Sequence, residues 1–275
     1  MTVSLTSDQP TSPNRFQKQW WAFVTAIQFL TRVPISSRAA DAQSLRDCPR
    51  YFPSVGGMIS LITVGLIWST SLVWPVWLAV LIALTLELRL TGAMHEDAVA
   101  DCCDAFGGGW TQERVLEIMK DSRLGTYGVL GLVSAVAIRI GATIQLLNST
   151  DHSEPLRWAV TLVASGVIGR WVILVVMWLV PPIEQRESLS RDVGQRMTLK
   201  DVFIGSVWMV PVFVLWTYLQ PWKALAGVLG LTMLVIWYRG LVLKKLGGIT
   251  GDCLGTVGYL GQLIVLLASI MEWPL

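Results

Sequence analysis

Seven apolar stretches, each near the length of a membrane-spanning helix, constrain the fold of this 275-residue chain more than any other feature. A helix needs about 20 apolar residues to cross the hydrocarbon core of a bilayer. Charged residues make up only 15% of the chain, whereas soluble domains contain about 25%. We therefore predict an all-α fold, a polytopic transmembrane helix bundle of about seven spans. The spans are expected at roughly residues 57–73, 76–92, 126–147, 157–180, 202–219, 223–243 and 256–273.

The region before the first span divides into a polar tail and an apolar segment. Residues 1–18 are dominated by Thr, Ser, Pro, Asn and Gln, which predicts a disordered tail without the apolar core of a signal peptide. Residues 20–35 are apolar but contain Gln28 and Arg32, so we predict an N-terminal interfacial helix or one packed against the bundle. No second domain or repeat is evident, and residues 19–275 are predicted to form a single integral-membrane catalytic domain.

Positive charge is concentrated in alternate loops. The connections near residues 74–75, 148–157 and 220–223 contain only two basic residues, Arg157 and Lys223. Because Lys and Arg gather in cytoplasmic loops, the charge-rich side is predicted to face the cytoplasm, and the protein is predicted to lie in the inner (cytoplasmic) membrane. That side carries Arg15, Lys18, Arg32, Arg38, Arg46, Arg50, Arg114, Lys120, Arg123, Arg186, Arg191, Arg196, Lys200, Lys244 and Lys245.

One stretch between two apolar segments, residues 90–125, contains a large share of the 19 acidic residues of the chain; we call it the acidic segment. Three of its carboxylates, Asp97, Asp101 and Asp104, are spaced i, i+4 and i+7, which places them on one face of a helix. Hard oxygen ligands at this density suit Mg²⁺ or Mn²⁺. The ordinary alternative is a solvated acidic helix face. The acidic residues of the segment are Glu96, Asp97, Asp101, Asp104, Glu113, Glu117 and Asp121.

The glycines at 107–109 are expected to end that helix, and Thr111 is expected to cap a second one over about residues 112–122. Lys120 and Arg123 place positive charge beside Asp121 there. Carboxylates that hold Mg²⁺, next to cations that bind phosphate, are what a diphosphate substrate requires. Ordinary helix salt bridges are the alternative.

A second polar patch spans residues 244–255 and includes Lys245, Gly251 and Asp252. Backbone amides at a helix start bind anions, although the glycines could equally serve close helix packing. We expect Asp252 to face the same polar cavity as the acidic segment. His95 is a candidate base, but a lone His is more often structural.

Several further charged residues lie inside predicted spans, among them Glu87, Arg139 and Arg170. Glu87 could pair with Arg89 or extend toward the interface. Arg139 and Arg170 are candidates for substrate phosphate or for structural ion pairs, because arginines inside a membrane face a cavity or a carboxylate. The net charge of +2 and the lack of a basic run with aromatics exclude a nucleic-acid role.

Several segments combine into a recognisable pattern whose strongest part is Thr91-Gly92 with His95, Asp97, Asp101 and Asp104. The pattern resembles the adenosylcobinamide-GDP ribazoletransferase (cobalamin 5′-phosphate synthase) family, from about residue 20 onward. Its other parts are residues 29–34, 51–53 with Gly56, 116–126, 246–248, 250–252 and 254–255.

The resemblance implies a transferase that joins adenosylcobinamide-GDP to α-ribazole or its 5′-phosphate and gives adenosylcobalamin (or its 5′-phosphate) and GMP. It implies Mg²⁺ as cofactor. The partners would be these two substrates and the lipid bilayer; association with a second copy or with other cobalamin-assembly enzymes is left open.

Together with the resemblance, the residue pattern assigns roles. Asp97, Asp101, Asp104 and Asp121 would hold Mg²⁺ on the diphosphate, and Asp104 or Asp121, with His95 as a further candidate, would accept the proton of the attacking ribose hydroxyl. The residues expected to bind the substrate phosphates are Arg123, Lys120, Lys245, Gly251 and Asp252.

The chain departs from the family pattern at three positions: Ala98 stands where Gly is usual, Glu96 replaces an apolar residue, and Glu87 has no usual counterpart. Two other readings are weaker. A CDP-alcohol phosphotransferase would need Gly at 98 and an Ala-Arg pair, and a divalent-cation transporter would place its carboxylates near the bilayer midplane.

Overall fold

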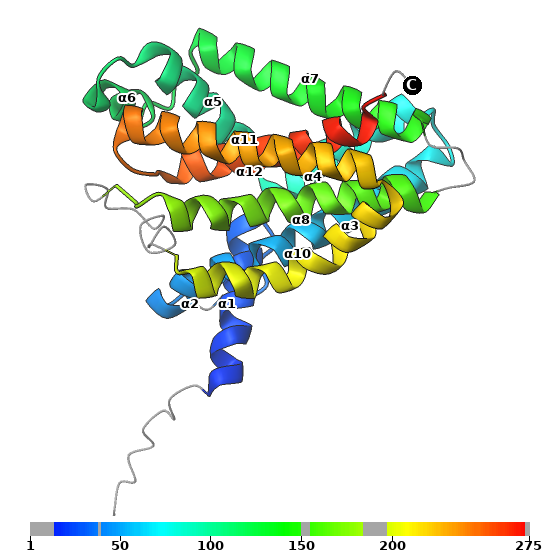
Figure 1. Ribbon diagram of the computed structural model, residues 1–275, viewed down its shortest axis with the longest axis horizontal. Helices are drawn as coiled ribbons and strands as arrows, with labels where there is room; N and C mark the ends of the chain where they lie inside the picture. Colours follow the sequence, from blue (N-terminus) through cyan, green and yellow to red (C-terminus); the bar gives the residue numbers. More distant parts are fainter. Residues whose placement is uncertain (1–13, 38–39, 150–154, 184–196, 273–275) are drawn as a thin grey trace, which may run out of the picture.

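The computed structural model describes residues 14–37, 40–149, 155–183 and 197–272 (Figure 1). Those residues form an all-α bundle without a named β-strand, and an isolated bridge joins Pro182 to Ile249. The predicted fold class is therefore confirmed. The helices are α1 Arg15–Leu30, α2 Ala42–Asp47, the 3₁₀ helix η1 Cys48–Tyr51, α3 Phe52–Ser71, α4 Val76–Thr91, α5 Met94–Gly108, α6 Gln112–Ile118, α7 Thr126–Ser149, α8 Pro155–Leu179, α10 Leu199–Leu219, α11 Pro221–Leu246 and α12 Gly251–Ile270.

Among the described residues, six helical segments are long and apolar enough to cross a membrane, and a seventh span results if α4 and α5 count as one. The predicted span at 76–92 corresponds to α4, which has 16 residues and turns by 84° into α5. The last helix begins at Gly251, five residues before the predicted span, because Thr250 caps it.

α8 lies in the middle of the bundle, between α3, α10 and α12 (Figure 1). Its 18-residue apolar window is 83% buried, whereas that of α10 is only 17% buried. α8 therefore forms the core, and α10 presents most of its surface to the surroundings. The glycines of α12 support this packing: Gly258 lies against Ile173 and Gly261 against Gly169, both on α8. Helix packing, one of the two roles considered for the glycines, is the role of these two.

α1 begins at Arg15, within the region predicted as a disordered tail, because Asn14 and Gln17 form a capping box. The rest of the predicted tail, residues 1–13, lies outside the described residues. The C-terminal part of α1 packs against α2, η1 and α3, and Phe29 stacks on Phe52 with ring centroids 5.6 Å apart. The predicted N-terminal helix is thus packed on the bundle along this part, while its start projects outward (Figure 1).

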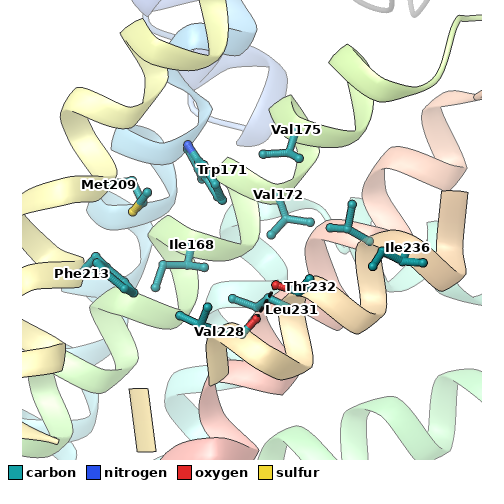
Figure 2. A pocket seen from close by; sticks show the side chains of 11 residues that line it. Ile168, Trp171, Val172, Val175, Met209, Phe213, Val228, Leu231, Thr232 and Ile236 are labelled. Carbon is teal, nitrogen blue, oxygen red and sulfur yellow. Dashed lines mark hydrogen bonds between the residues drawn. The ribbon is translucent and has the colours of Figure 1, made fainter. Parts of the chain in front are cut away.

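An apolar cavity of about 400 Å³ lies between α8, α10 and α11. Figure 2 shows Trp171, Met209 and Phe213 around it. The Trp171 indole donates to Ser206, and the Thr232 hydroxyl donates to the Val228 carbonyl within its own helix. Because it lies among the middles of three apolar helices, we treat this cavity as part of the membrane-embedded surface.

Candidate active site

The bend between α4 and α5 is the local structure that positions the acidic segment. Gly92 ends α4 with φ 71°, and Ala93 follows with φ 57°. The left-handed region suits glycine at Gly92 but is uncommon for a residue with a Cβ, such as Ala93. The backbone N–H of Arg32 donates to the Leu90 carbonyl at 2.8 Å and ties the end of α1 to this bend. As a result, α5 leaves at a steep angle to α4, at the end of the bundle that holds α6 and the α11–α12 turn (Figure 1).

α5 has two sides of different character. His95, Glu96, Ala98 and Val99 are buried, and Asp97, the next residue after Glu96, is exposed. Asp101 and Asp104 are half-buried. The predicted helix and its end at the three glycines are confirmed. The carboxylates of the acidic segment, however, do not form one group, because Glu96 faces the interior.

Inside the bundle, Arg139 of α7 joins two carboxylates. Its guanidinium lies 2.6 Å from Glu87 of α4 and 3.3 Å from Glu96 of α5. Thr63 of α3 donates to the other oxygen of Glu87 at 2.7 Å, and the Arg139 guanidinium lies 5.7 Å from the centre of the Tyr259 ring. Each of these three charged residues is at most 7% exposed. We call Glu87, Glu96 and Arg139 the buried triad. Of the two roles considered for Arg139, the structure shows the structural ion pair, and Glu87 pairs with Arg139 rather than with Arg89.

Arg170 of α8 also has a partner within the bundle. It donates to Gln262 of α12 at 2.7 Å, and the side chain is 3% exposed. Its charge acts electrostatically on both carboxylates of the buried triad. The structure therefore places Arg170 beside the triad, in the interior.

Asp104 lies at the start of α7. One carboxylate oxygen accepts the N–H of Gly125 at 2.7 Å, and the other accepts the N–H of Gly128 at 2.7 Å. Free N–H groups at a helix start need such an acceptor. A Cβ at either glycine would overlap the Asp104 side chain, so this close approach requires glycine. Asp104, predicted as a metal ligand and base, therefore serves here as a cap for α7.

Asp121 lies after α6. This helix begins at Gln112, after the predicted cap Thr111, and ends at Ile118, whereas the predicted helix extended to about residue 122. Arg123 contacts Asp121 with an N–O distance of 2.7 Å. Hydrogen bonds from the Arg123 side chain lower the pKa of Asp121 to about 2, from an ordinary value of 3.8. Asp121 is thus ionised at neutral pH. Lys120 is exposed beside it.

The patch at residues 244–255 packs against the acidic segment through Lys245. Lys245 donates to the carbonyls of Phe106 and Gly109, at 3.1 and 2.7 Å, and lies over Trp110. A cation at the C-terminal end of a helix stabilises its free carbonyls. The ammonium of Lys245 thus caps the end of α5, whereas Gly251 and Asp252 form the first turn of α12.

A partly enclosed cavity of about 210 Å³ lies where α1, α3, α5, α8 and α12 meet; we call it the His95 cavity. Its wall is mostly apolar and includes the stacked pair Phe29 and Phe52. His95, Gly251 and Asp252 also line it. His95 is 3% exposed, and its Nε2 has no hydrogen-bond partner among the described residues. The cavity therefore brings together three residues that the sequence had assigned to the site.

Comparison with known proteins adds a second kind of evidence. The family model described as Cobalamin-5-phosphate synthase matches residues 22–270. The chain belongs to this family.

Curated relatives agree with the match. The chain is 31% identical over 265 residues to a protein of Leptospira interrogans, 34% identical over 258 residues to one of Shewanella frigidimarina and 34% identical over 264 residues to one of Ralstonia pickettii. The alignments cover 93–94% of this chain and 96–98% of the relatives, and all three are named "Adenosylcobinamide-GDP ribazoletransferase". No solved structure matches the chain.

The resemblance of the acidic segment to this cobalamin-5-phosphate synthase family implies Mg²⁺ as cofactor. The side chains of the segment would then have to supply suitable ligands for this ion. Within the part of the chain that the structure describes, no three His, Cys, Asp or Glu side chains form a group that could hold a metal ion. Mg²⁺ usually takes only one or two protein carboxylates, together with waters and substrate phosphates. Asp97 and Asp101, one turn apart on α5, fit this requirement, since both offer hard oxygen ligands outside the buried triad.

In this member of the family, sequence reasoning missed the buried triad as a unit and the capping role of Asp104. A signal for the triad exists in the sequence. Glu87 and Arg139 are opposite charges in different apolar spans, and buried charges in a membrane pair with each other. The role of Asp104 gave no comparable signal, because 21 residues separate it from Gly125.

Proposed function

We propose that this chain is a membrane-bound transferase that joins adenosylcobinamide-GDP to α-ribazole or α-ribazole 5′-phosphate and releases GMP. The observation that carries the proposal is the family match across residues 22–270. Relatives that carry the ribazoletransferase name align with this chain over nearly their whole length.

The reaction transfers the cobinamide-bearing phosphoryl group of a diphosphate from GMP to a ribose hydroxyl. The ribose hydroxyl of the acceptor forms a new bond to the cobinamide-side phosphorus, the bond from that phosphorus to the GMP oxygen breaks, and GMP leaves with the electron pair. The hydroxyl proton passes to a carboxylate. Asp121, ionised at neutral pH, is one candidate acceptor; Asp104 is the other, although it would have to release the Gly125 and Gly128 amides.

Asp97 and Asp101 would hold Mg²⁺, which when bound would offset the negative charge of the diphosphate. The predicted ligands Asp104 and Asp121 remain part of the proposal, with the additional requirement that each exchange its present partner for the metal. Lys120 and Arg123 would bind nucleotide phosphates, because both are exposed at the edge of α5 and α6. Gly251 and Asp252 start a 20-residue helix whose first N–H groups would face an anion.

The proposed orientation has the active site facing the cytoplasm from the inner membrane. It rests on the unequal distribution of Lys and Arg between alternate loops. A cysteine introduced at exposed Glu113 should react with a membrane-impermeant reagent only from the cytoplasmic side, and one at exposed Val73, in the α3–α4 turn, only from the other side. The reverse labelling pattern would overturn the orientation.

Cation transport is not favoured by the interior of the bundle. A transporter would need carboxylates that can receive a cation near the midplane. The interior carboxylates Glu87 and Glu96 instead share the guanidinium of Arg139, so a positive charge already occupies that position.

The test is an endpoint assay on the purified protein in detergent. Adenosylcobinamide-GDP, α-ribazole 5′-phosphate and Mg²⁺ are supplied, and GMP and the corrinoid product are separated by chromatography, with EDTA in a parallel sample. We expect both products to form in equal amounts and only without EDTA. A folded, monodisperse sample that forms neither product would contradict the proposed activity, and equal product with EDTA would contradict the metal requirement.

A further inference from the structure

The His95 cavity has the dimensions of a site for part of a substrate. Sites for drug-sized ligands have volumes of about 300–1,000 Å³, and this one measures about 210 Å³. It cannot enclose a corrin ring or a whole nucleotide. A single flat bicyclic ring is an appropriate occupant, because the aromatic side chains of Phe29 and Phe52 and the apolar side chains of Met94 and Leu254 all line the cavity.

The polar groups of the wall are few. Most of the lining surface is apolar, and the polar side chains on it are His95 and Asp252. A buried nitrogen without a hydrogen bond is unfavourable, so the Nε2 of His95, which has no partner among the described residues, is available to a bound molecule. A water molecule would need two to four polar partners, which an apolar wall supplies poorly.

We propose that the His95 cavity binds the benzimidazole base of the nucleoside acceptor, with the His95 Nε2–H donating a hydrogen bond to the free ring nitrogen of the base. The inference rests on the proposed function and names the site of one of its two substrates. A benzimidazole nucleoside presents one free acceptor nitrogen and otherwise apolar edges. The wall of the cavity is mostly apolar and includes His95, whose Nε2 has no partner among the described residues, and Asp252.

The other base in the reaction fits less well. Guanine carries a carbonyl oxygen, an exocyclic amine and ring nitrogens on its edges, and each would lose its water on entering. His95 and Asp252 could satisfy only part of that set. The position is also suitable for an acceptor. α5 carries both His95, which lines the cavity, and the proposed metal ligands Asp97 and Asp101. Gly251, in the first turn of α12, lines the cavity as well.

The first test replaces His95. His95→Phe keeps a ring in place but removes the donor, and should raise KM for α-ribazole 5′-phosphate by about three- to tenfold, with KM for adenosylcobinamide-GDP and kcat unchanged. His95→Gln restores a donor near the same position and should recover most of the loss. Thr217→Val is the matched control, because Thr217 also has a hydroxyl without a partner among the described residues but lies on α10, away from the cavity. It should leave both KM values unchanged.

The second test changes the shape of the wall. The wild-type enzyme should favour a 5,6-dimethylbenzimidazole nucleoside over the unsubstituted one by about 16-fold in kcat/KM, because each of the two buried methyl groups adds about fourfold. Leu254→Phe narrows the cavity and should remove or invert that preference. A change in rank between two acceptors does not follow from general destabilisation, so this result holds even if Leu254→Phe lowers the yield of folded protein.

The outcomes separate the inference from the proposed function. No GMP from the wild-type enzyme with either nucleoside would overturn both. Normal wild-type turnover, with the acceptor ranking unchanged in Leu254→Phe and KM unchanged in His95→Phe, would overturn the inference alone. A fall in kcat at saturating acceptor in His95→Phe, without a change in KM, would instead identify His95 as the base and overturn its assignment to substrate binding.

Discussion

The two sides of α5 carry the same chemical group in opposite circumstances. Glu96 faces inward and lies 3.3 Å from the guanidinium of Arg139, which Glu87 also contacts. Asp97, the next residue, is exposed, and Asp101 follows one turn later on the same side. An inward carboxylate is balanced by a fixed arginine, whereas the outward ones are those that we propose as Mg²⁺ ligands. In this proposal, the side of the helix on which a carboxylate lies distinguishes structural from catalytic carboxylates.

Removing the arginine breaks the inward side and should have the largest effect. Arg139→Met leaves two carboxylates buried without a counter-charge, and loss of one partner of a buried ion pair costs about 3–5 kcal/mol. We expect a large fall in Tm and in the yield of folded protein. Thermal unfolding in detergent measures it, with Arg89→Met, an exposed arginine on α4, as control. A triple variant that adds Glu87→Gln and Glu96→Gln should regain stability. Wild-type Tm in Arg139→Met would contradict the pairing.

Removing a charge from the outward side should affect activity and not stability. Asp101→Asn should lower kcat by at least about 100-fold, because it removes a proposed ligand of the Mg²⁺ that would offset charge in the transition state. The Tm should remain that of the wild type, and the Mg²⁺ concentration needed for half-maximal activity should rise. GMP release across a Mg²⁺ titration checks this. Near-normal turnover of Asp101→Asn would contradict the assignment of Asp101 as a metal ligand.

Asp104 caps α7 and is also a proposed catalytic residue. Two variants, Asp104→Ala and Asp104→Asn, distinguish the structural role from the catalytic one. Asp104→Ala should lower stability by about 0.5–2 kcal/mol, because the start of α7 loses its acceptor. Asp104→Asn keeps an acceptor oxygen and should retain most of that stability. If Asp104 also holds Mg²⁺ or accepts the proton, the Asn variant is stable but inactive. If capping is its only role, the Asn variant is active, and the predicted catalytic role is wrong.

The exposed pair of Asp121 and Arg123 should give the smallest effect on stability. A carboxyl whose pKa is lowered in the folded protein adds stability above its unfolded pKa and loses it as the pH falls through the folded value, here between about 4 and 2. Because both side chains are exposed, Arg123→Gln should leave Tm unchanged from pH 5 to 8 while raising KM for adenosylcobinamide-GDP. A drop in Tm across that range would show that the pair is structural.

The sequence was sufficient to predict the spans and the acidic helix, because apolar run length and the i, i+4, i+7 spacing are local features. It did not predict the contacts between distant segments. Lys245, which is predicted to bind phosphate, donates to the carbonyls of Phe106 and Gly109, 139 and 136 residues away in the chain. Glu96 was counted with the other carboxylates, because the charge of a residue does not reveal which side of its helix packs.

The length of α4 has a consequence for the membrane itself. With 16 residues at 1.5 Å each, α4 is about 24 Å long, and the hydrocarbon core of a typical bilayer is about 30 Å thick. Either the bend at Gly92 and Ala93 lies below the lipid headgroups, or the bilayer thins around it. Hydrophobic mismatch is thus built into the α4–α5 corner, and acyl-chain length becomes a variable of catalysis: thinner bilayers would bring the carboxylates of α5 closer to the water from which both substrates arrive.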